Sequence, residues 1–490
     1  MGAVAAPPVA ARYEAVIGIE IHVQLKTASK MFCGCATDIK DAPPNSRTCP
    51  VCLGLPGTLP VINRRAVELV LATGLALGAS TPEFTRWDRK NYFYPDLPKG
   101  YQISQYDLPL AANGHLDIET VQGPLRVGIR RAHLEEDTAR LIHATDAHGR
   151  RVSLVDFNRS GMPLMEVVTE PDLRTGEGAR RYAEELRLLL LAIGASDAAM
   201  EEGQMRVEAN VSLRPLGTEA FGIRTEVKNM NSFRSVERAV AFEIERQGRA
   251  LDAGETLRQE TRGWDDDRGT TYMMRSKEDS HDYRYFPEPD LPPLRADPVW
   301  LASIRAGLPE LPAARRARYR DAIGLSAHDA AVLVADPAAG AVFEAALAAE
   351  PGSSAKTVAN WVIGEYLRLA HAAPVAPRVD GAELGRLVRL VEDGTISRTS
   401  AKTVFERHAT TGERVEAIVE DLGLTQITDR GELLAAIDAV LAAHPDAVAE
   451  VRAGKAQAQG FLVGQVMRAT RGQAKADAVQ ALLRERLERG

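Results

Sequence analysis

Hydrophobic and polar residues alternate with a period of two in several parts of the chain, which predicts strands with one buried face. In residues 16–25 the alternation is complete: the apolar face would carry Ile17, Ile19, Ile21, Val23 and Leu25, and the polar face Glu20, His22 and Gln24. Residues 207–214 and 223–228 repeat the pattern with carboxylates on their polar faces. Same-face residues two apart lie about 6 to 7 Å apart, so one cation could contact both Glu20 and His22. A solvent-exposed face of an antiparallel sheet would give the same pattern.

Helical spacing with polar caps and terminal glycines predicts helices in two parts of the chain. Those at 175–194 and 231–248 are interspersed with strands, which indicates an α+β domain with an antiparallel sheet and packed helices. Five prolines from Phe286 to Pro298 exclude a helix or central strand there and predict a domain boundary. Beyond it no long strand pattern recurs, and short helices are predicted at 354–371, 380–392, 397–408, 431–443 and 457–470.

Composition and charge describe an ordinary globular chain. Of the 490 residues 26% are charged and 45% hydrophobic, and no apolar run approaches the roughly 20 residues that span a bilayer. The net charge of -7 gives no indication of a nucleic-acid partner, although it leaves room for a local basic face. Residues 451–490 have eight basic residues against three acidic ones, which suits either phosphate contacts or a solvated helical face. The Ala- and Pro-rich residues 1–12 lack a secretory signal, so we expect a disordered extension of a cytoplasmic protein.

The four cysteines lie in one short window, as Cys33, Cys35, Cys49 and Cys52. The second pair has the C-x-x-C spacing of zinc ribbons and knuckles, whereas the first pair is tighter. Two disulfides are the alternative, but a chain without a secretory signal is more often reduced. The cluster therefore predicts structural zinc, with four thiolates closing the site to catalysis.

Aromatic and basic residues are interleaved between Arg86 and Tyr106. Such a segment suits stacking on bases or on a terminal adenosine, with Arg and Lys holding phosphates. A proline-rich loop packing its aromatics on the core would look the same. The chain has neither a P-loop nor a G-x-G-x-x-G motif, and Ser353 or Ser354 is better interpreted as a helix N-cap than as a nucleophile.

Eight segments together resemble the B subunit of the aspartyl/glutamyl-tRNA amidotransferase family. They are Glu20-x-His22 and the motifs at 88–96, 101–105, 133–137, 156–159, 274–278, 282–290 and 460–467. The resemblance implies a cradle-shaped catalytic domain at 13–292 with a zinc-binding insert at 33–52, a helical domain at 293–410, and a small helical tail domain for tRNA binding at 411–490. It also implies a heterotrimer in which the A subunit is a glutaminase and a small C subunit braces the assembly.

The activity implied by this resemblance is a carbon–nitrogen ligase with glutamine as amido donor. The B subunit of the family phosphorylates the side-chain carboxylate of Glu-tRNA(Gln) or Asp-tRNA(Asn) with ATP and then amidates it with ammonia from the glutaminase. Magnesium, ATP and structural zinc are the implied cofactors and co-substrate. A tRNA-binding module without chemistry and a magnesium-dependent phosphohydrolase are the other function classes that fit the residues.

The resemblance also assigns residues, position by position. It implies a magnesium site formed by Glu20, His22, Glu136, Glu166 and Glu208. Lys90 and Glu136 would be catalytic, with their pairing allowing gated proton handling near the route of ammonia. The side chains implied to hold the aminoacylated end of the tRNA are Tyr92, Tyr94, Tyr101 and Gln102, and the four cysteines resemble those of zinc-binding family members.

Overall fold

The computed structural model describes residues 9–276, 283–372, 377–427, 429–453, 455–470 and 473–489. The chain divides into two compact units, residues 1–312 and 313–490. Residues 1–8 of the predicted extension at 1–12 lie outside the described residues. Val9–Ala11 form a short 3-10 helix, and Val9 is buried in the core of the first unit. Parts of the motifs at 274–278 and 282–290 also lie outside the described residues.

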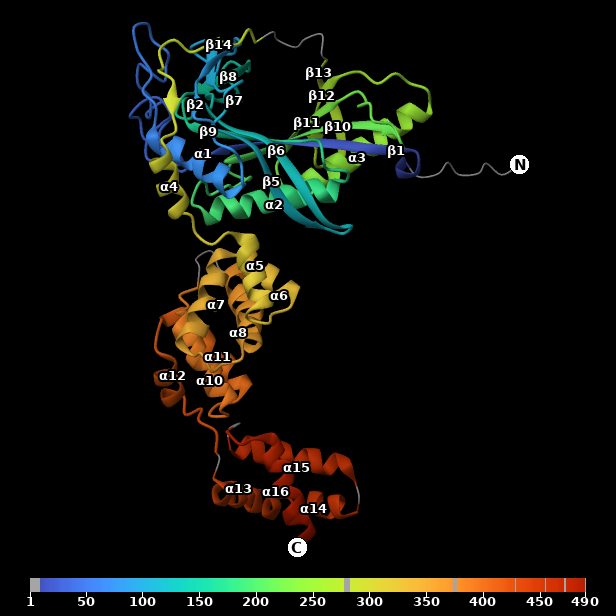
Figure 1. Cartoon of the computed structure of the whole chain (residues 1–490). Helices are drawn as coiled ribbons and strands as arrows, with labels where there is room; N and C mark the ends of the chain where they lie inside the picture. The colour runs from blue at the N-terminus through green and yellow to red at the C-terminus, as the bar shows by residue number, and fades with distance from the viewer. Residues whose placement is uncertain are drawn as a thin grey trace, which may run out of the picture. The chain divides into compact units, whose positions relative to one another are not determined.

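An eight-stranded sheet organises the first unit, in the order β13-β12-β11-β10-β1-β9-β6-β5 (Figure 1). Its neighbours are antiparallel except β11 and β12, which pair in parallel. The strands are β1 (Tyr13–Gln24), β5 (Ala111–Thr120), β6 (Gly123–Glu136), β9 (Pro163–Thr169), β10 (Met205–Pro215), β11 (Thr225–Met230), β12 (Glu260–Asp265) and β13 (Thr270–Ser276). The three strands predicted from alternation are β1, β10 and β11, which confirms an antiparallel sheet beside packed helices.

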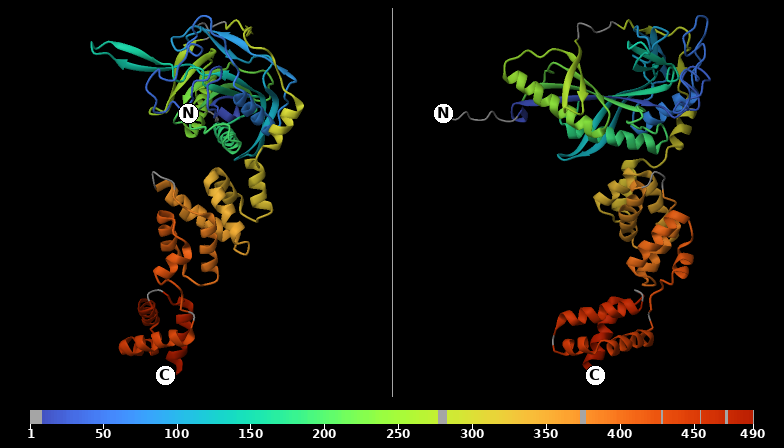
Figure 2. Two further views of the ribbon diagram at one scale, coloured as in Figure 1. Left: turned by 90° about the vertical axis from the view of Figure 1, so that its left-hand side faces the viewer. Right: turned by 180° about the vertical axis from the view of Figure 1, so that it is seen from behind.

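One face of this sheet is apolar and is covered by helices. Figures 1 and 2 show α2 (Gly176–Ala192) and α3 (Phe233–Asp252) along that face, and α1 (Arg64–Ala76) packs on β5 and β6. Ile17, Ile19 and Ile21 of β1 are fully buried in this core. Because alternate side chains point to opposite faces, the polar half of each strand is turned away from the helices.

A small three-stranded sheet, β14-β3-β4, contributes residues to the same cleft as the polar face of the large sheet. Its strands are β3 (Asp88–Asn91), β4 (Tyr101–Ser104) and β14 (Phe286–Pro287). The remaining strands form two pairs, β2 (Phe84–Thr85) with β15 (Leu294–Arg295) and β7 (Arg140–Thr145) with β8 (Arg151–Asp156). The proline-rich segment is therefore tied into the first unit, and α4 (Pro298–Ala306) packs on α1. The division of the chain falls later than the predicted boundary, after Pro312.

The second unit is helical in its described residues, apart from one isolated bridge between Ile427 and Ala474. Its elements are α5 (Pro312–Asp321), α6 (Ala327–Ala335), α7 (Pro337–Ala349), α8 (Ala355–Trp361), a π-helical turn (Val362–Tyr366), α9 (Leu367–Ala372), α10 (Gly381–Glu392), α11 (Arg398–Thr411), α12 (Val415–Asp421), α13 (Arg430–Ala443), α14 (Pro445–Arg452), α15 (Ala456–Ala469) and α16 (Ala476–Arg489). Ser354 caps α8 by accepting a hydrogen bond from the Thr357 amide, as expected.

Two separate apolar cores lie in this unit. The first collects residues from Tyr319 to Val419, so it extends past residue 410 and includes α12. The second is built from α13, α15 and α16. Among the described helices none is by itself long and apolar enough to cross a membrane, and the one consecutive pair that passes by length and composition, α6 and α7, bends by 116° between its members.

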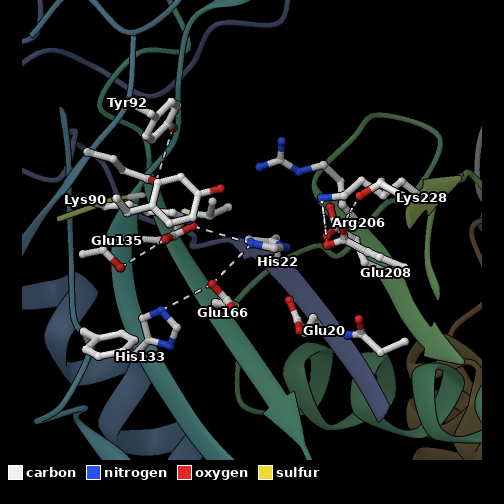
Figure 3. A pocket seen from close by; sticks show the side chains of 18 of the residues that line it. Glu20, His22, Lys90, Tyr92, His133, Glu135, Glu166, Arg206, Glu208 and Lys228 are labelled. Carbon is white, nitrogen blue, oxygen red and sulfur yellow. Dashed lines mark hydrogen bonds and ion pairs between the residues drawn. The ribbon is translucent and has the colours of Figure 1, made fainter. Parts of the chain in front are cut away.

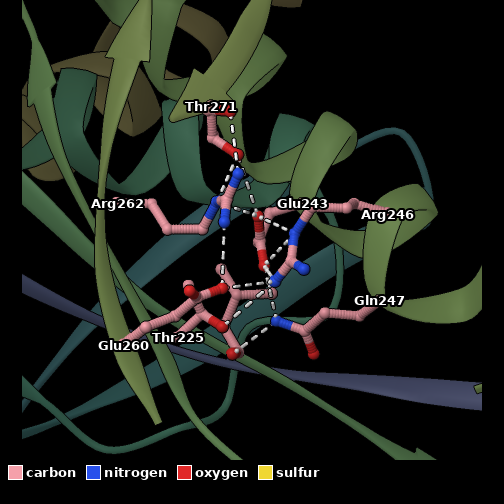
Figure 4. Close-up of polar contacts among 8 residues, drawn as sticks. Thr225, Glu243, Arg246, Gln247, Glu260, Arg262 and Thr271 are labelled. Carbon is pink, nitrogen blue, oxygen red and sulfur yellow. Dashed lines mark hydrogen bonds and ion pairs between the residues drawn. The ribbon is translucent and has the colours of Figure 1, made fainter. Parts of the chain in front are cut away.

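A buried ionic network fastens the edge strands of the large sheet to α3 (Figure 4). Glu243 is fully buried and accepts hydrogen bonds from Arg246, from Gln247 and from the hydroxyl of Thr271. Arg262 of β12 lies 3.8 Å from the same carboxylate. Glu243 therefore neutralises guanidinium groups that hold β12 and β13 in place.

Replacing Glu243 with Ala leaves Arg246 and Arg262 with Glu260 as their remaining carboxylate partner and opens a cavity in the core. We expect Glu243→Ala to lower the free energy of unfolding of the first unit by about 2 to 3 kcal/mol, because the hydrogen bonds from Arg246, Gln247 and Thr271 lose their buried charged acceptor. Urea titration monitored by tryptophan fluorescence measures this change. Glu245→Ala, on the exposed side of the same helix, is the control and should change it by less than about 0.5 kcal/mol. Equal stability of the two variants would contradict the role given to Glu243.

Candidate functional site

Charged side chains from five neighbouring strands meet on the polar face of the large sheet (Figure 3). The antiparallel register places His22 opposite Glu166, Glu166 opposite His133, and Glu20 opposite Glu208. The register therefore accounts for this convergence, since directly paired residues point to the same face. They line a cleft of about 460 Å³.

Two imidazoles and two carboxylates form the first group in the cleft. His22 Nε2 lies 3.4 Å from Glu166 Oε2 and 3.7 Å from Glu135 Oε1. His133 Nε2 lies 3.4 Å from the same oxygen of Glu166. One ligand atom each from His22, Glu135 and Glu166 lie within 4.8 Å of one another. Among the described residues only imidazoles pair with these two carboxylates as cations, and a divalent ion would take over that role.

The electrostatics of this group favour an ionised Glu166. Burial by itself raises the pKa of Glu166, but the His133 and His22 imidazoles outweigh it and hold the pKa well below its usual range. Burial lowers the pKa of His22, whereas its hydrogen bond to Glu166 and the charges of Glu166 and Glu135 raise it, with a net result of about 9. Glu166 is thus available as an anionic ligand.

A second group of carboxylates lies beside the first. Glu20, Glu208 and Glu226 each place one oxygen within 4.8 Å of the others. Lys228 Nζ lies 2.7 Å from Glu208 and 3.3 Å from Glu226, and Asn210 donates to Glu20. Burial and the neighbouring charges of Glu166 and Glu208 raise the pKa of Glu20. Lys228 already balances part of this group, so its need for a bound cation is smaller than that of the first.

Glu136 does not lie with the other predicted magnesium ligands. It follows Glu135 along β6, and alternation turns its side chain to the opposite face. There its carboxylate pairs with Lys99 and accepts a hydrogen bond from the Ile103 amide, lining a separate pocket of about 210 Å³. The structure does not pair Lys90 with Glu136 as predicted, because Lys99 forms the ion pair with Glu136 instead. Glu135 takes the place beside His22.

Lys90 faces the cleft from β3. Its Nζ lies 5.0 Å from the centre of the Tyr283 ring. Burial lowers the pKa of Lys90, but the charges of Glu135 and Glu166 and the nearby tyrosines raise it above its ordinary value. The side chain is therefore a permanent positive charge and a poor proton acceptor.

The predicted substrate residues separate into two sets. Tyr92 and Gln102 line the cleft and are joined by a hydrogen bond of 3.4 Å. Tyr101 lines the smaller pocket, with the Arg89 guanidinium 4.3 Å from its ring centre, and Tyr94 packs edge-on against Tyr92. Two of the four predicted residues thus line the cleft.

Several cleft residues were not predicted from the sequence. They are Tyr106, His133, Glu135, Arg206, Lys228, Tyr283 and Tyr285. Alternation within 133–137 was the available signal for His133 and Glu135, which fall on one face. Stacking of Tyr106 on Tyr285, with ring centres 4.4 Å apart, had no signal because the two residues are distant in sequence.

The four cysteines converge as predicted. Their sulfur atoms lie within 4.8 Å of one another, and all four are free of disulfides. The Cys49 amide donates a hydrogen bond to Cys52 Sγ at 3.1 Å. The donor set fits tetrahedral zinc.

Comparison with known proteins gives matches over nearly the whole chain. Residues 15–302 match the family described as the GatB/GatE catalytic domain, and residues 341–487 match the GatB domain. Among the similar curated proteins are three that are named as the B subunit of an aspartyl/glutamyl-tRNA(Asn/Gln) amidotransferase. The protein of Carboxydothermus hydrogenoformans is 51% identical over 97% of this chain and 99% of its own length. The proteins of Moorella thermoacetica and Dehalococcoides mccartyi are 52% and 49% identical over 97% and 98% of this chain, and each is covered completely.

Measurement of divalent-cation binding should distinguish the role of Glu135 from that of Glu136. We expect Glu135→Gln to weaken Mn²⁺ binding about tenfold or more, because it removes one anionic oxygen beside His22. Glu136→Gln, which changes only the opposite face of the same strand, should alter the affinity less than about twofold. Titration with Mn²⁺ followed by electron paramagnetic resonance measures both. A larger loss of Mn²⁺ affinity in Glu136→Gln than in Glu135→Gln would make Glu136 the metal ligand.

Proposed function

The chain belongs to the B-subunit family of the aspartyl/glutamyl-tRNA(Asn/Gln) amidotransferases, and on that premise we propose that it phosphorylates and then amidates the side-chain carboxylate of Glu-tRNA(Gln) or Asp-tRNA(Asn). ATP is the phosphoryl donor and glutamine, hydrolysed by a partner protein, the source of ammonia. The first step joins a carboxylate oxygen to the γ-phosphorus and releases ADP. The second joins nitrogen to the acyl carbon and releases phosphate.

The observation that carries this proposal is the charge of the cleft. Among the described residues, seven acidic side chains line it, and five lysines and arginines and two histidines lie among them. ATP, tRNA and the attacking carboxylate are all anions, and the carboxylates of the cleft repel them unless a cation bound there offsets that charge. The carboxylates are a binding surface for divalent ions that accompany the nucleotide, as in other phosphoryl-transfer sites.

The residues present fit magnesium. His22, Glu135 and Glu166 would hold the ion, with Glu20 and Glu208 beside them. When bound, magnesium offsets negative charge on the phosphates during transfer. Lys90 adds a fixed positive charge from the opposite wall, suited to the acyl phosphate or to the carboxylate that precedes it.

The tyrosines of the cleft would position the aminoacylated end of the tRNA. Tyr92, Tyr283 and Tyr285 surround Lys90, with Tyr92 and Tyr283 edge to face at 6.0 Å. Aromatic faces of this kind stack on an unpaired base without regard to its identity. Tyr94 and Tyr101 are not among the residues that line the cleft, and we propose them only as secondary contacts.

Glu136 enters the proposal through the neighbouring pocket. Ammonium must lose a proton before nitrogen can attack an acyl group. A buried carboxylate beside a small pocket is a suitable acceptor, and Lys99 holds Glu136 there. We therefore assign Glu136 a catalytic role in accepting the proton of ammonium instead of a role in metal binding.

The other parts of the proposal concern assembly. Membership of the B-subunit family implies a heterotrimer with two partners, the glutaminase or A subunit, which releases ammonia from glutamine, and the small C subunit. The cysteine cluster would hold structural zinc, and the helical residues 411–490 would contact tRNA. The complex would work in the cytoplasm, where aminoacyl-tRNA is made.

Reconstitution with the A and C subunits tests the chemistry. The complex is supplied with ATP, glutamine and either Glu-tRNA(Gln) or Asp-tRNA(Asn), and the amino acid released from the tRNA is identified by chromatography. We expect the amide. Glu166→Gln should reduce its rate at least about a hundredfold, which corresponds to about 2.7 kcal/mol, because it removes an anionic oxygen that would hold the divalent ion.

Glu119→Gln, on an exposed position of the same sheet, is the matched control and should leave the rate unchanged. A complex that binds tRNA but forms no amide would favour a binding module. ATP hydrolysis without amide would favour a phosphohydrolase. Either result would overturn the proposed reaction.

The division of labour gives a separate prediction. We expect the purified single chain to release no ammonia from glutamine above the uncatalysed rate, and addition of the glutaminase partner to restore release. A coupled glutamate dehydrogenase assay measures it. Robust release by the single chain, at a rate proportional to its concentration, would contradict the assignment of glutaminase activity to the partner.

A further inference from the structure

Lys30 is a fully buried lysine that the proposed reaction does not use. Its Nζ lies 3.7 Å from Cys52 Sγ and 3.3 Å from the main-chain oxygen of Phe157. Within the part of the chain that the structure describes, no carboxylate lies within ion-pair distance of it. The partners of this ammonium are thus one sulfur atom and one carbonyl.

A buried ammonium needs a negative charge nearby. A thiol and a carbonyl offer only dipoles, and transfer of an unpaired ammonium into the interior has a large free-energy cost. A thiolate at Cys52 would supply the missing charge. Four thiolates crowded within 4.8 Å would in turn repel one another unless a cation lay among them.

We propose that Lys30 is the counter-charge of a zinc centre formed by Cys33, Cys35, Cys49 and Cys52. The inference rests on the structural zinc of the proposed function and adds a residue to it. Zinc with four thiolates retains two negative charges in excess. Lys30 removes one of them and donates a hydrogen bond to Cys52, as outer partners of metal ligands commonly do.

The backbone holds Lys30 ready for this role. The Lys30 main-chain amide donates to the carbonyl oxygen of Cys35 at 2.9 Å. The side-chain amide of Asn63 donates to the carbonyl oxygen of Lys30 at 3.2 Å. Gly161 has a φ of +79°, and a Cβ there would lie 3.5 Å from Cys52 and 3.7 Å from the Lys30 side chain. The main chain of Lys30 is therefore hydrogen-bonded on both sides, and a side chain at residue 161 would contact both Cys52 and Lys30.

The same contacts connect the zinc centre to the catalytic strand. The Lys30 ammonium donates a hydrogen bond to the carbonyl oxygen of Phe157. The turn after Phe157 leads to Gly161, whose amide donates to the Asp137 carbonyl oxygen at the end of β6. Met31 donates to the Gly161 oxygen at 2.8 Å. Lys30 thus joins the cysteine cluster to the segment that supports Glu135 and Glu136.

Zinc affinity of the full chain tests the proposal. Lys30→Met keeps the length of the side chain and removes its charge. We expect it to weaken zinc binding about 10- to 100-fold in competition with a chromophoric chelator. The Co²⁺-substituted protein should retain its tetrathiolate absorption, because the four ligands are unchanged. Lys26→Met, at an exposed lysine four residues earlier, is the control and should bind zinc like the wild type.

Thermal stability with and without zinc gives a second readout. Lys30→Met should melt at a lower temperature than the wild type when both hold zinc, because the excess negative charge of the zinc centre is then left without its counter-charge. After removal of zinc the difference between the two should become smaller, because the centre whose charge Lys30 offsets is gone. A lysine needed only for packing would lower the melting temperature by the same amount in both states.

The outcomes separate this inference from the zinc site itself. If the wild type binds zinc as weakly as Cys49→Ser does, the proposed zinc site itself is wrong. If the wild type binds zinc tightly and Lys30→Met binds it equally tightly, the role proposed for Lys30 is overturned. Should Lys30→Met not fold, Lys30→Gln, which can keep the hydrogen bond to Phe157, is measured in its place. Failure of both variants to fold at saturating zinc would make Lys30 a folding residue and overturn the proposal.

Discussion

The two-residue period of the large sheet is the constraint on which the rest of the molecule depends. Every second residue of β1 must enter the helix-covered core, so Glu20 and His22 are forced to the other face. Antiparallel pairing then repeats that choice in each neighbouring strand. A shift of one residue would bury the carboxylates and expose the isoleucines, so the fold and the site are fixed by the same register.

Like charges gathered in one cleft are tolerated because each has a defined partner. Lys228 balances Glu208 and Glu226, while Arg206 and Arg159 hold the buried Asp137 carboxylate. The group around Glu166 differs, since imidazoles are its cationic partners among the described residues. It is accordingly the part of the cleft with most to gain from a divalent ion, and Lys90 is placed across from it.

Buried charges also anchor the surroundings of the cleft. Glu243 ties the edge strands to α3 through two guanidinium groups (Figure 4). Lys30 ties the cysteine cluster to the turn that ends at Gly161. In both cases substitution would remove a buried charged group on which neighbouring polar atoms converge, so we expect such positions to respond strongly to substitution.

The sequence by itself determined the period of β1, β10 and β11, the helical second half, the four-cysteine cluster and, through its motifs, the family. These features are local or depend on residue type, so a single chain reveals them. Only the tertiary structure decided that Glu135 and not Glu136 stands beside His22, and that Lys99 and not Lys90 pairs with Glu136. It also decided that the first unit extends to Pro312, since the packing of α4 on α1 is a long-range contact. Ion pairs such as Lys99 with Glu136 join residues far apart in sequence, and their choice of partner follows from the folded position of each strand.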